Sequence, residues 1–312
     1  LIVDRLSVLG IMEKRSTGYF EKGLNGMVNS LSVKIGDKIR RCVRKGDYLL
    51  LNRQPTLHRF SVMALKVNEF TITKTIGVNY GISTQYHFDY DGDEMNIFVV
   101  PDIRDYAGII NMMSIGRNII TEQGSRNIVS ITQDGATGLF MLTQKDVILD
   151  RSTWLSFVPF NRIEMIPSLQ ERCLRKNIPI YSGRALFSLL LPEDFEYKKK
   201  ISKRVVGSRK VRVNKEMLKD TIFVETKKRD GIELKEGMII DEPIEEDFFV
   251  IENGVLIKGA VSTEVIGSSS DSLIHALTDI TKYNEDTPLE FINGCLYIGN
   301  KYTTYSGISP GL

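Results

Sequence analysis

Three short, mostly apolar runs decide the fold of the N-terminal half: DYLLL at residues 47–51, VMALKV at 62–67 and FTIT at 70–73. Each run has the length of a single strand, and turn residues separate one run from the next. This pattern predicts a compact β-barrel rather than a wound α/β sheet, and we assign the barrel to residues 34–107. Residues 1–33 are punctuated by glycine, show no clear period and receive no assignment.

Beyond Pro101 the pattern changes to helical spacing. Apolar side chains recur every three or four positions across residues 103–113, with Asp102 in the first turn. A second helix is expected from about Gln133 to Leu142, and mixed segments follow. The sequence therefore predicts an α+β protein, in which residues 108–312 form a second, mixed α/β region.

Two charged tracts lie in the second half of the chain. Residues 198–215 are strongly basic, with valines interleaved among the lysines and arginines, and residues 241–247 are acidic. The alternation predicts a β-ribbon with a basic face, within an insertion near residues 195–245. One interpretation is a solvated surface hairpin, and the other is contact with nucleic acid or a neighbouring subunit.

The amino-acid composition argues against several other classes of protein. Lys and Arg number 41 and Asp and Glu number 39, so the net charge of +2 does not by itself indicate a nucleic-acid partner. Three scattered cysteines argue against a disulfide framework and fit a reduced, intracellular setting. The apolar run at residues 186–191 is too short to cross a bilayer, so no membrane partner is expected. Because the chain opens without Met, we expect a piece of a longer, soluble protein.

The densest chemistry is the string DYDGDEMN at residues 89–96. Asp89, Asp91 and Asp93 stand at alternate positions, where their charges would repel one another unless a cation balanced them. Carboxylate oxygens suit Mg²⁺ or Ca²⁺, and Gly92 permits a bend that would converge the three side chains. A magnesium ion held by few protein ligands keeps positions open for phosphates, which favours phosphoryl or nucleotidyl transfer.

Three rival interpretations of this string differ in how well they fit. An EF-hand needs Gly at position six and Glu at position twelve, but those positions hold Glu94 and Val100. A glycosidase carboxylate pair does not need three aspartates in five residues. An Asp-rich surface turn stays open, although apolar flanks at Tyr86 and Phe88 and at residues 97–100 indicate a loop that leaves a packed barrel.

A second motif, LNRQPTLHR, occupies residues 51–59. The fork of N–H donors on Arg53 suits phosphate or ribose, Asn52 and Gln54 are able to bind sugar hydroxyls, and Pro55 stiffens the turn. The alternative is an ordinary turn in which Arg53 makes a structural salt bridge.

Together, NRQPTLH at residues 52–58 and DYDGDEM at 89–95 resemble the largest subunit of multisubunit DNA-directed RNA polymerases. That family carries the first motif followed by N-A-D-F-D-G-D-[EQ]-M. The strings QDG at 133–135, IPIYSGR at 178–184 and GVLIKG at 254–259 resemble the family's pore domain. The chain departs from the family's pattern at His87, Phe88 and Tyr90, and none of these departures removes an aspartate.

The resemblance implies a double-psi β-barrel active-site domain over residues 34–107 and a pore domain over 108–312. It implies that Asp89, Asp91 and Asp93 hold a catalytic Mg²⁺ for transfer of a nucleotide from NTP to the RNA 3′ end. Nucleotide-binding roles carry over to four residues of the two motifs: Arg53, Asn96, Gln54 and Pro55. Implied partners are the second-largest subunit, other polymerase subunits, the DNA template, the RNA transcript and NTPs.

Two alternatives of other classes remain: a non-catalytic assembly or nucleic-acid-binding module, and a two-barrel RNA-dependent RNA polymerase. The isolated piece is expected to be inactive, because the family's bridge helix and trigger loop are not found in it. The divergent strings suggest a large cytoplasmic DNA virus as the source. The location would then be the cytoplasm, in a viral factory or virion, and otherwise the nucleus.

Overall fold

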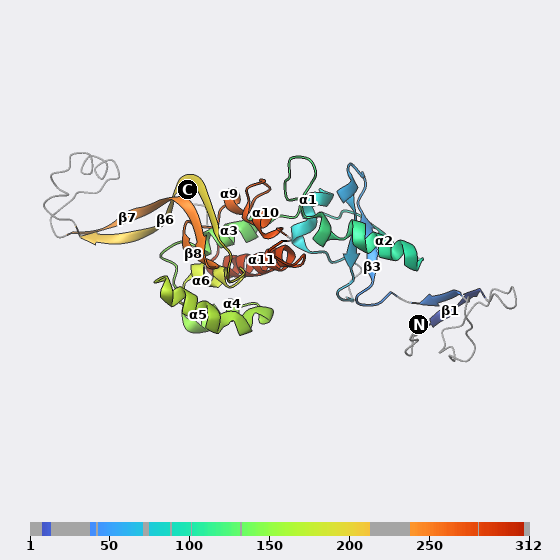
Figure 1. The fold of residues 1–312 in the computed structure, drawn as a ribbon, viewed down its shortest axis with the longest axis horizontal. Coiled ribbons are helices and arrows are strands. Elements are labelled where there is room, and N and C mark those ends of the chain that lie inside the picture. The colour runs from blue at the N-terminus through green and yellow to red at the C-terminus, as the bar shows by residue number, and fades with distance from the viewer. Residues whose placement is uncertain are drawn as a thin grey trace.

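The computed structural model describes residues 8–13, 38–41, 43–70, 75–87, 89–100, 102–131, 133–212, 238–279 and 281–308. These parts combine small antiparallel sheets with short helices and one long helix, in an α+β arrangement (Figure 1). The strands are β1 (Val8–Glu13), β2 (Lys38–Arg41), β3 (Tyr48–Asn52), β4 (Val62–Lys66), β5 (Asn96–Phe98), β6 (Tyr197–Arg212), β7 (Ile239–Glu252) and β8 (Val255–Lys258). The α-helices are α1 (Ser83–Tyr86), α2 (Ile103–Met113), α3 (Gln133–Leu142), α4 (Arg151–Phe157), α5 (Ile166–Arg175), α6 (Gly183–Ser188), α9 (Thr263–Ile266), α10 (Leu273–Leu277) and α11 (Thr287–Ser306). Short 3₁₀ helices are η2 (Arg59–Ser61), η3 (Tyr80–Ile82), η4 (Ile115–Asn118) and η5 (Phe160–Met165).

The N-terminal half is built around a three-stranded antiparallel sheet in the order β4-β3-β5. Leu51 in the central strand lies opposite Met63 on one side and Ile97 on the other. Leu51 and Met63 are buried, and they pack with Phe60, Ile82 and Tyr86 in a small core.

Within the described residues of the N-terminal half, strands β4, β3 and β5 form an open sheet and not a closed barrel. The outer edge of β4 makes only an isolated bridge, from Ala64 to Ser114, and β5 is an edge strand within the described residues. Closing a barrel requires both edges to be paired. Of the predicted strand at 70–73, Phe70 lies outside any strand and residues 71–74 fall outside the described part of the chain.

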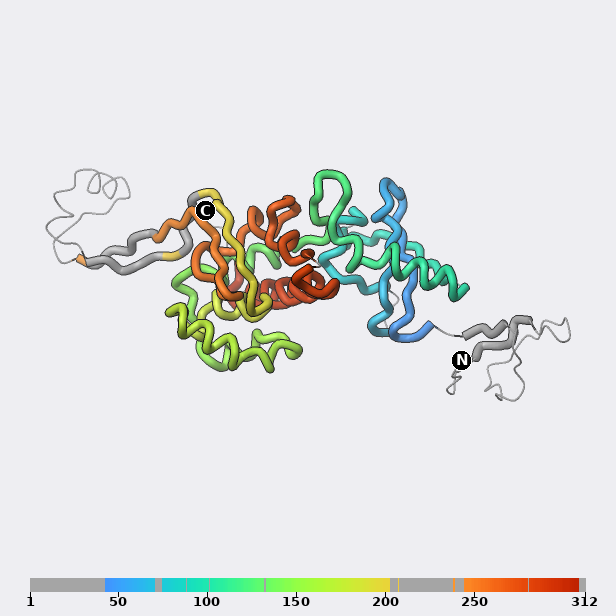
Figure 2. The backbone as a smooth tube through the Cα atoms, viewed as in Figure 1, coloured from blue at the N-terminus to red at the C-terminus, as the bar shows by residue number. Residues whose placement is uncertain are grey.

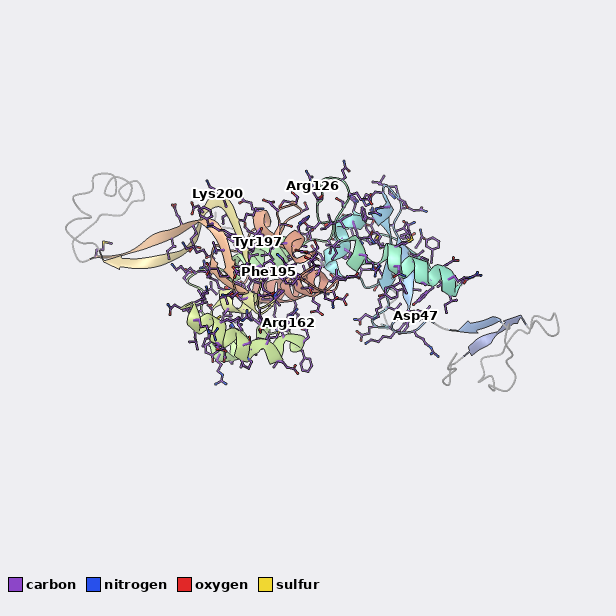
Figure 3. All side chains as sticks on the ribbon, in the orientation of Figure 1. Asp47, Arg126, Arg162, Phe195, Tyr197 and Lys200 are labelled. Atoms are coloured by element: carbon purple, nitrogen blue, oxygen red, sulfur yellow. The ribbon has the colours of Figure 1, made fainter. Side chains whose placement is uncertain are left out.

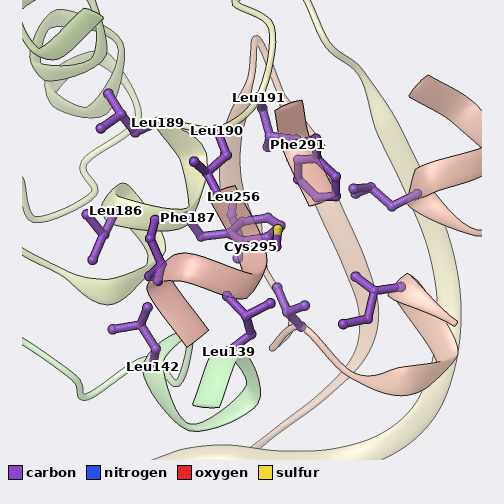
Figure 4. Packing of buried hydrophobic residues seen from close by; sticks show 14 of the residues in the cluster. Leu139, Leu142, Leu186, Phe187, Leu189, Leu190, Leu191, Leu256, Phe291 and Cys295 are labelled. Carbon is purple, nitrogen blue, oxygen red and sulfur yellow. The ribbon is translucent and has the colours of Figure 1, made fainter. Parts of the chain in front are cut away.

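The C-terminal half has a much larger core. Trp154, Phe187, Phe249 and Phe291 are fully buried in it, and so is the leucine-rich run of α6 and the turn that follows (Figure 4). The predicted helices at 103–113 and 133–142 are confirmed as α2 and α3.

Glycines allow α3 and α11 to cross at very short range. A Cβ atom added at Gly138 would lie 2.1 Å from the carbonyl oxygen of Gly299, and one added at Gly299 would lie 2.3 Å from that of Gly135. Only residues without a side chain permit this approach. In Figure 2, α11 (red) runs through the middle of the molecule, with the sheet of the N-terminal half (blue) to its right and helices α4 and α5 (yellow-green) below it.

The charged tracts form the predicted ribbon. Strands β6 and β7 pair antiparallel and project from the body, with Phe195, Tyr197 and Lys200 at the end where the ribbon joins it (Figures 1 and 3). The register sets basic positions opposite acidic ones: Arg204 with Glu246, Arg209 with Glu242 and Lys210 with Asp241. Residues 213–215 of the basic tract lie outside the described part.

Strand β7 is fixed to the body by a buried ion pair. Arg184, at the start of α6, donates to Glu246 at 3.1 Å, to the carbonyl of Ile257 at 2.8 Å and to that of Thr143 at 3.1 Å. The two charged side chains are 5% and 13% exposed, so the pair is shielded from water. Among the described helices, none is both long and apolar enough to span a bilayer.

Candidate metal centre

The aspartate loop lies between helix α1 and strand β5 of the sheet. Helix α1 ends at His87, whose φ of 50° is left-handed and turns the chain out of the helix. The preceding residue, Tyr86, is buried and donates its hydroxyl to the carbonyl of Leu51 at 3.2 Å. Its burial raises the pKa of Tyr86 to about 12. The start of the loop is therefore tied to the central strand, as the apolar flank at Tyr86 predicted.

The structure brings the three aspartates together. One carboxylate oxygen from each of Asp89, Asp91 and Asp93 lies within 4.8 Å of the others, and all three residues are exposed. Gly92 has a φ of +116°, a conformation that L side chains rarely adopt, and this provides the predicted bend. A hydrogen bond with Asp89 and repulsion from its charge raise the pKa of Asp91. A donor set of clustered carboxylate oxygens fits a hard cation such as Mg²⁺.

Arg53 lies directly beside this cluster. Its Nε donates to Asp93 Oδ2 at 2.9 Å and its Nη2 donates to Asp93 Oδ1 at 3.2 Å, a bidentate pair. Its Nη1 also donates to the carbonyl of Tyr86 at 3.3 Å. The two motifs, far apart in sequence, thus meet at one point.

The other predicted nucleotide-binding residues follow Arg53 in the chain or lie on the neighbouring strand. Gln54 and Pro55 are exposed and joined by a cis peptide bond, and exposed Asn96 lies opposite Asn52 in the sheet. Asn52 does not match its predicted role as a sugar ligand. It is buried, and its side-chain oxygen accepts a hydrogen bond from Thr56 at 2.8 Å, so it stiffens the turn instead.

The apolar flank after the loop is not packed as expected. Ile97, Phe98 and Val99 are 46%, 51% and 62% exposed. The prediction of a packed flank was wrong for these described residues because β5 is short and lies at the edge of the sheet.

Sequence reasoning missed the contact between two tyrosines at the loop. The rings of Tyr80 and Tyr90 are stacked, with centroids 5.5 Å apart and planes 14° from parallel. Burial raises the pKa of both phenols, and the charge of Asp134 adds to the effect at Tyr80. Tyr80 belongs to no motif, so only its place in the fold reveals the contact. His87, one of the departures from the family's pattern, also makes a ring contact: its centroid lies 5.4 Å from that of His58.

Comparisons with known proteins agree with this geometry. Residues 13–115 match the family model of RNA polymerase Rpb1, domain 2, and residues 118–312 match that of RNA polymerase Rpb1, domain 3. The chain therefore belongs to the Rpb1 family, the largest subunits of DNA-directed RNA polymerases.

Individual relatives span most of the chain. It is 28% identical over 284 residues, 91% of its length, to DNA-directed RNA polymerase II subunit RPB1-A of Trypanosoma brucei brucei. It is 26% identical over 308 residues, 96% of its length, to DNA-directed RNA polymerase III subunit RPC1 of Plasmodium falciparum. The corresponding subunit of Saccharomyces cerevisiae is 32% identical over 164 residues, 51% of the chain. The chain spans only 14%, 12% and 11% of these three relatives.

Proposed function

We propose that this chain is the metal-holding part of the catalytic subunit of a DNA-directed RNA polymerase, which transfers a nucleotide from NTP to the RNA 3′ end. The observation that carries the proposal is the cluster of three carboxylate oxygens within 4.8 Å, with Arg53 bound to one of the carboxylates. Family membership supports it, as do the names of the relatives, which are subunits of DNA-directed polymerases.

Asp89, Asp91 and Asp93 would hold Mg²⁺ in this proposal. When bound, Mg²⁺ would activate the RNA 3′-hydroxyl and balance the charge that develops on the α-phosphate as pyrophosphate leaves. The loop itself presents three carboxylates on an exposed turn, so that substrate oxygens are able to reach the same point.

Arg53 would position the nucleotide. Its contacts use one N–H from each guanidinium nitrogen, and the group carries two further N–H donors for ribose or phosphate oxygens. Asn96 lies opposite Asn52, the residue before Arg53, so its exposed amide would act on the same sugar. Gln54 and Pro55 would line the approach to Arg53.

The finer architecture is also proposed. Residues 34–107 would complete a double-psi β-barrel, and residues 108–312 would form the pore region through which nucleotides enter. The second-largest subunit, other polymerase subunits, template DNA and transcript would be partners. The exposed Ile97, Phe98 and Val99 beside the loop suit a covered surface in the assembly. An intracellular, soluble location is proposed, in a viral factory or virion if the source is viral and in the nucleus otherwise.

Substitution of one carboxylate tests the proposal. In the complete enzyme, Asp91→Asn keeps the size of the side chain but removes its charge, and RNA synthesis should fall below detection while the subunits still assemble. Asp105→Asn, on the exposed side of α2, is the matched control and should elongate RNA normally. Normal elongation by Asp91→Asn at saturating Mg²⁺ would overturn the proposal and favour the non-catalytic alternative.

A further inference from the structure

The carboxylate loop receives little apolar support from its own sheet. The apolar residues that follow it are half exposed, and Tyr90, between Asp89 and Asp91, is itself 60% exposed. One face of the Tyr90 ring is nevertheless covered, because it stacks on Tyr80 at 5.5 Å. The position of Tyr80 therefore bears directly on where the middle of the loop lies.

Tyr80 is fixed by the C-terminal half of the molecule. It opens η3, packs against the large core, and is flanked by two anchored residues. The side chain of Asn79 accepts a hydrogen bond from Gly81 N at 2.9 Å and donates one to Asn293 of α11 at 2.6 Å. Gly81 is so close to α11 that an added Cβ would lie 3.3 Å from Ile292.

A continuous series of contacts therefore joins α11 to the loop. It runs from Asn293 to Asn79, along the backbone to Tyr80, across the ring stack to Tyr90, and so to the aspartates on either side. We propose that Tyr80 is a positioning residue, which holds Tyr90 and thereby sets the spacing of Asp89 and Asp91. The inference rests on the proposed function, since it concerns the same three carboxylates.

The expected effect follows from the strength of an aromatic pair. Stacked rings contribute enough beyond their burial to change an equilibrium by about twofold to tenfold. Loss of the stack should weaken cation binding at the loop by that factor. The Tyr80 hydroxyl is not needed for stacking, so Tyr80→Phe should bind the cation as the unaltered protein does.

The test uses Fe²⁺ as the probe, in the complete enzyme. Fe²⁺ with ascorbate and peroxide generates hydroxyl radicals that cut the chain where the ion is held, and the concentration for half-maximal cutting near residues 87–95 measures binding. Tyr80→Ala should raise that concentration about twofold to tenfold. Tyr80→Phe and Tyr305→Ala, an exposed tyrosine of α11, should leave it unchanged.

The outcomes separate the inference from the proposed function. Loss of cutting in Asp91→Asn, together with unchanged cutting in Tyr80→Ala, would overturn the role of Tyr80 alone. Unchanged cutting in Asp91→Asn would overturn the metal site itself. Tyr80→Ala could weaken Fe²⁺ binding simply by destabilising the fold, which a lower melting temperature than that of Tyr305→Ala would reveal. In that case Tyr90→Ala is the variant to measure, because it removes the same stack by truncating the exposed ring. Normal Fe²⁺ binding by Tyr90→Ala would then contradict the inference.

Discussion

The described residues within 43–100 and those within 118–308 bury their apolar side chains to very different extents. The first region carries the carboxylates and has a core limited to a few residues around Leu51 and Tyr86. The second has no proposed catalytic group but contains the large core around Trp154, Phe187 and Phe291. The two cores meet at Ile115 and Ile128, which pack against both.

This difference indicates how the exposed carboxylate loop is held in place. In the proposed function substrates must reach the carboxylates, so the loop is not buried, and the small sheet beneath it supplies limited packing. Contacts with the larger region supply the rest. Asn79 donates a hydrogen bond to Asn293 of the larger region at 2.6 Å, and Arg117, in the segment between the two regions, pairs with Glu285 at 3.2 Å.

The largest loss of unfolding free energy is expected for a substitution in the larger region. Arg184→Ala would leave the largely shielded Glu246 without its cationic partner and leave two carbonyl groups without the Arg184 donor, which should cost about 3–5 kcal/mol of unfolding free energy. Chemical denaturation measures the loss. Arg175→Ala, which breaks an exposed pair with Glu171, should cost less than about 1 kcal/mol. Equal losses of unfolding free energy in the two variants would show that shielding from water does not strengthen the Arg184–Glu246 pair.

A second variant tests the close crossing of the two helices. Gly138→Ala places a methyl group 2.1 Å from a backbone oxygen of α11, and overpacking of this kind costs about 1–3 kcal/mol or more. Thermal unfolding of the chain should show this loss of stability as a lower melting temperature.

The matched control for that variant is Gly108→Ala in α2. An added Cβ there meets nothing within 4 Å, and alanine favours a helix over glycine by about 1 kcal/mol. Gly108→Ala should therefore be neutral or stabilising. A stable Gly138→Ala would show that α3 and α11 move apart easily and that the larger region is not the rigid one.

The smallest loss of unfolding free energy is expected for a substitution in the smaller region. Tyr86→Phe removes the hydroxyl that donates to the carbonyl of Leu51, and loss of one such hydrogen bond costs about 0.5–1.5 kcal/mol of unfolding free energy. Tyr305→Phe, at an exposed site, should have no measurable effect on stability. If Tyr86→Phe destabilised the chain more than Arg184→Ala, the smaller region would be the main source of stability and the comparison would be reversed.

The sequence predicted the elements whose pattern is local. Helical spacing located α2 and α3, and alternating valines located the β6–β7 ribbon. The convergence of the three aspartates followed from their alternate positions and from Gly92, whose left-handed φ gives the bend. Because the aspartates lie within five positions of one another, a single turn brings them together, and the local pattern was sufficient to predict it.

Other features could not be predicted because they depend on tertiary contacts between segments far apart in the sequence. Ile97, Phe98 and Val99 look like buried strand residues in the sequence, but they are half exposed because β5 lies at a sheet edge. Tyr80 has no motif, and its role emerges only because α11, more than 200 residues later, fixes the residue beside it. Asn52 was expected to bind a sugar, but it is buried in the turn, where it accepts a hydrogen bond from Thr56.

Anomalous diffraction would show directly whether Asp89, Asp91 and Asp93 hold the ion. Crystals of the complete enzyme grown with Mn²⁺ should show, in an anomalous difference map, a peak bonded to carboxylate oxygens of Asp89, Asp91 and Asp93, at metal–oxygen distances of about 2.0–2.2 Å. The peak should be absent in Asp91→Asn. A map with no peak between these carboxylates, or with the same peak in Asp91→Asn, would contradict the account.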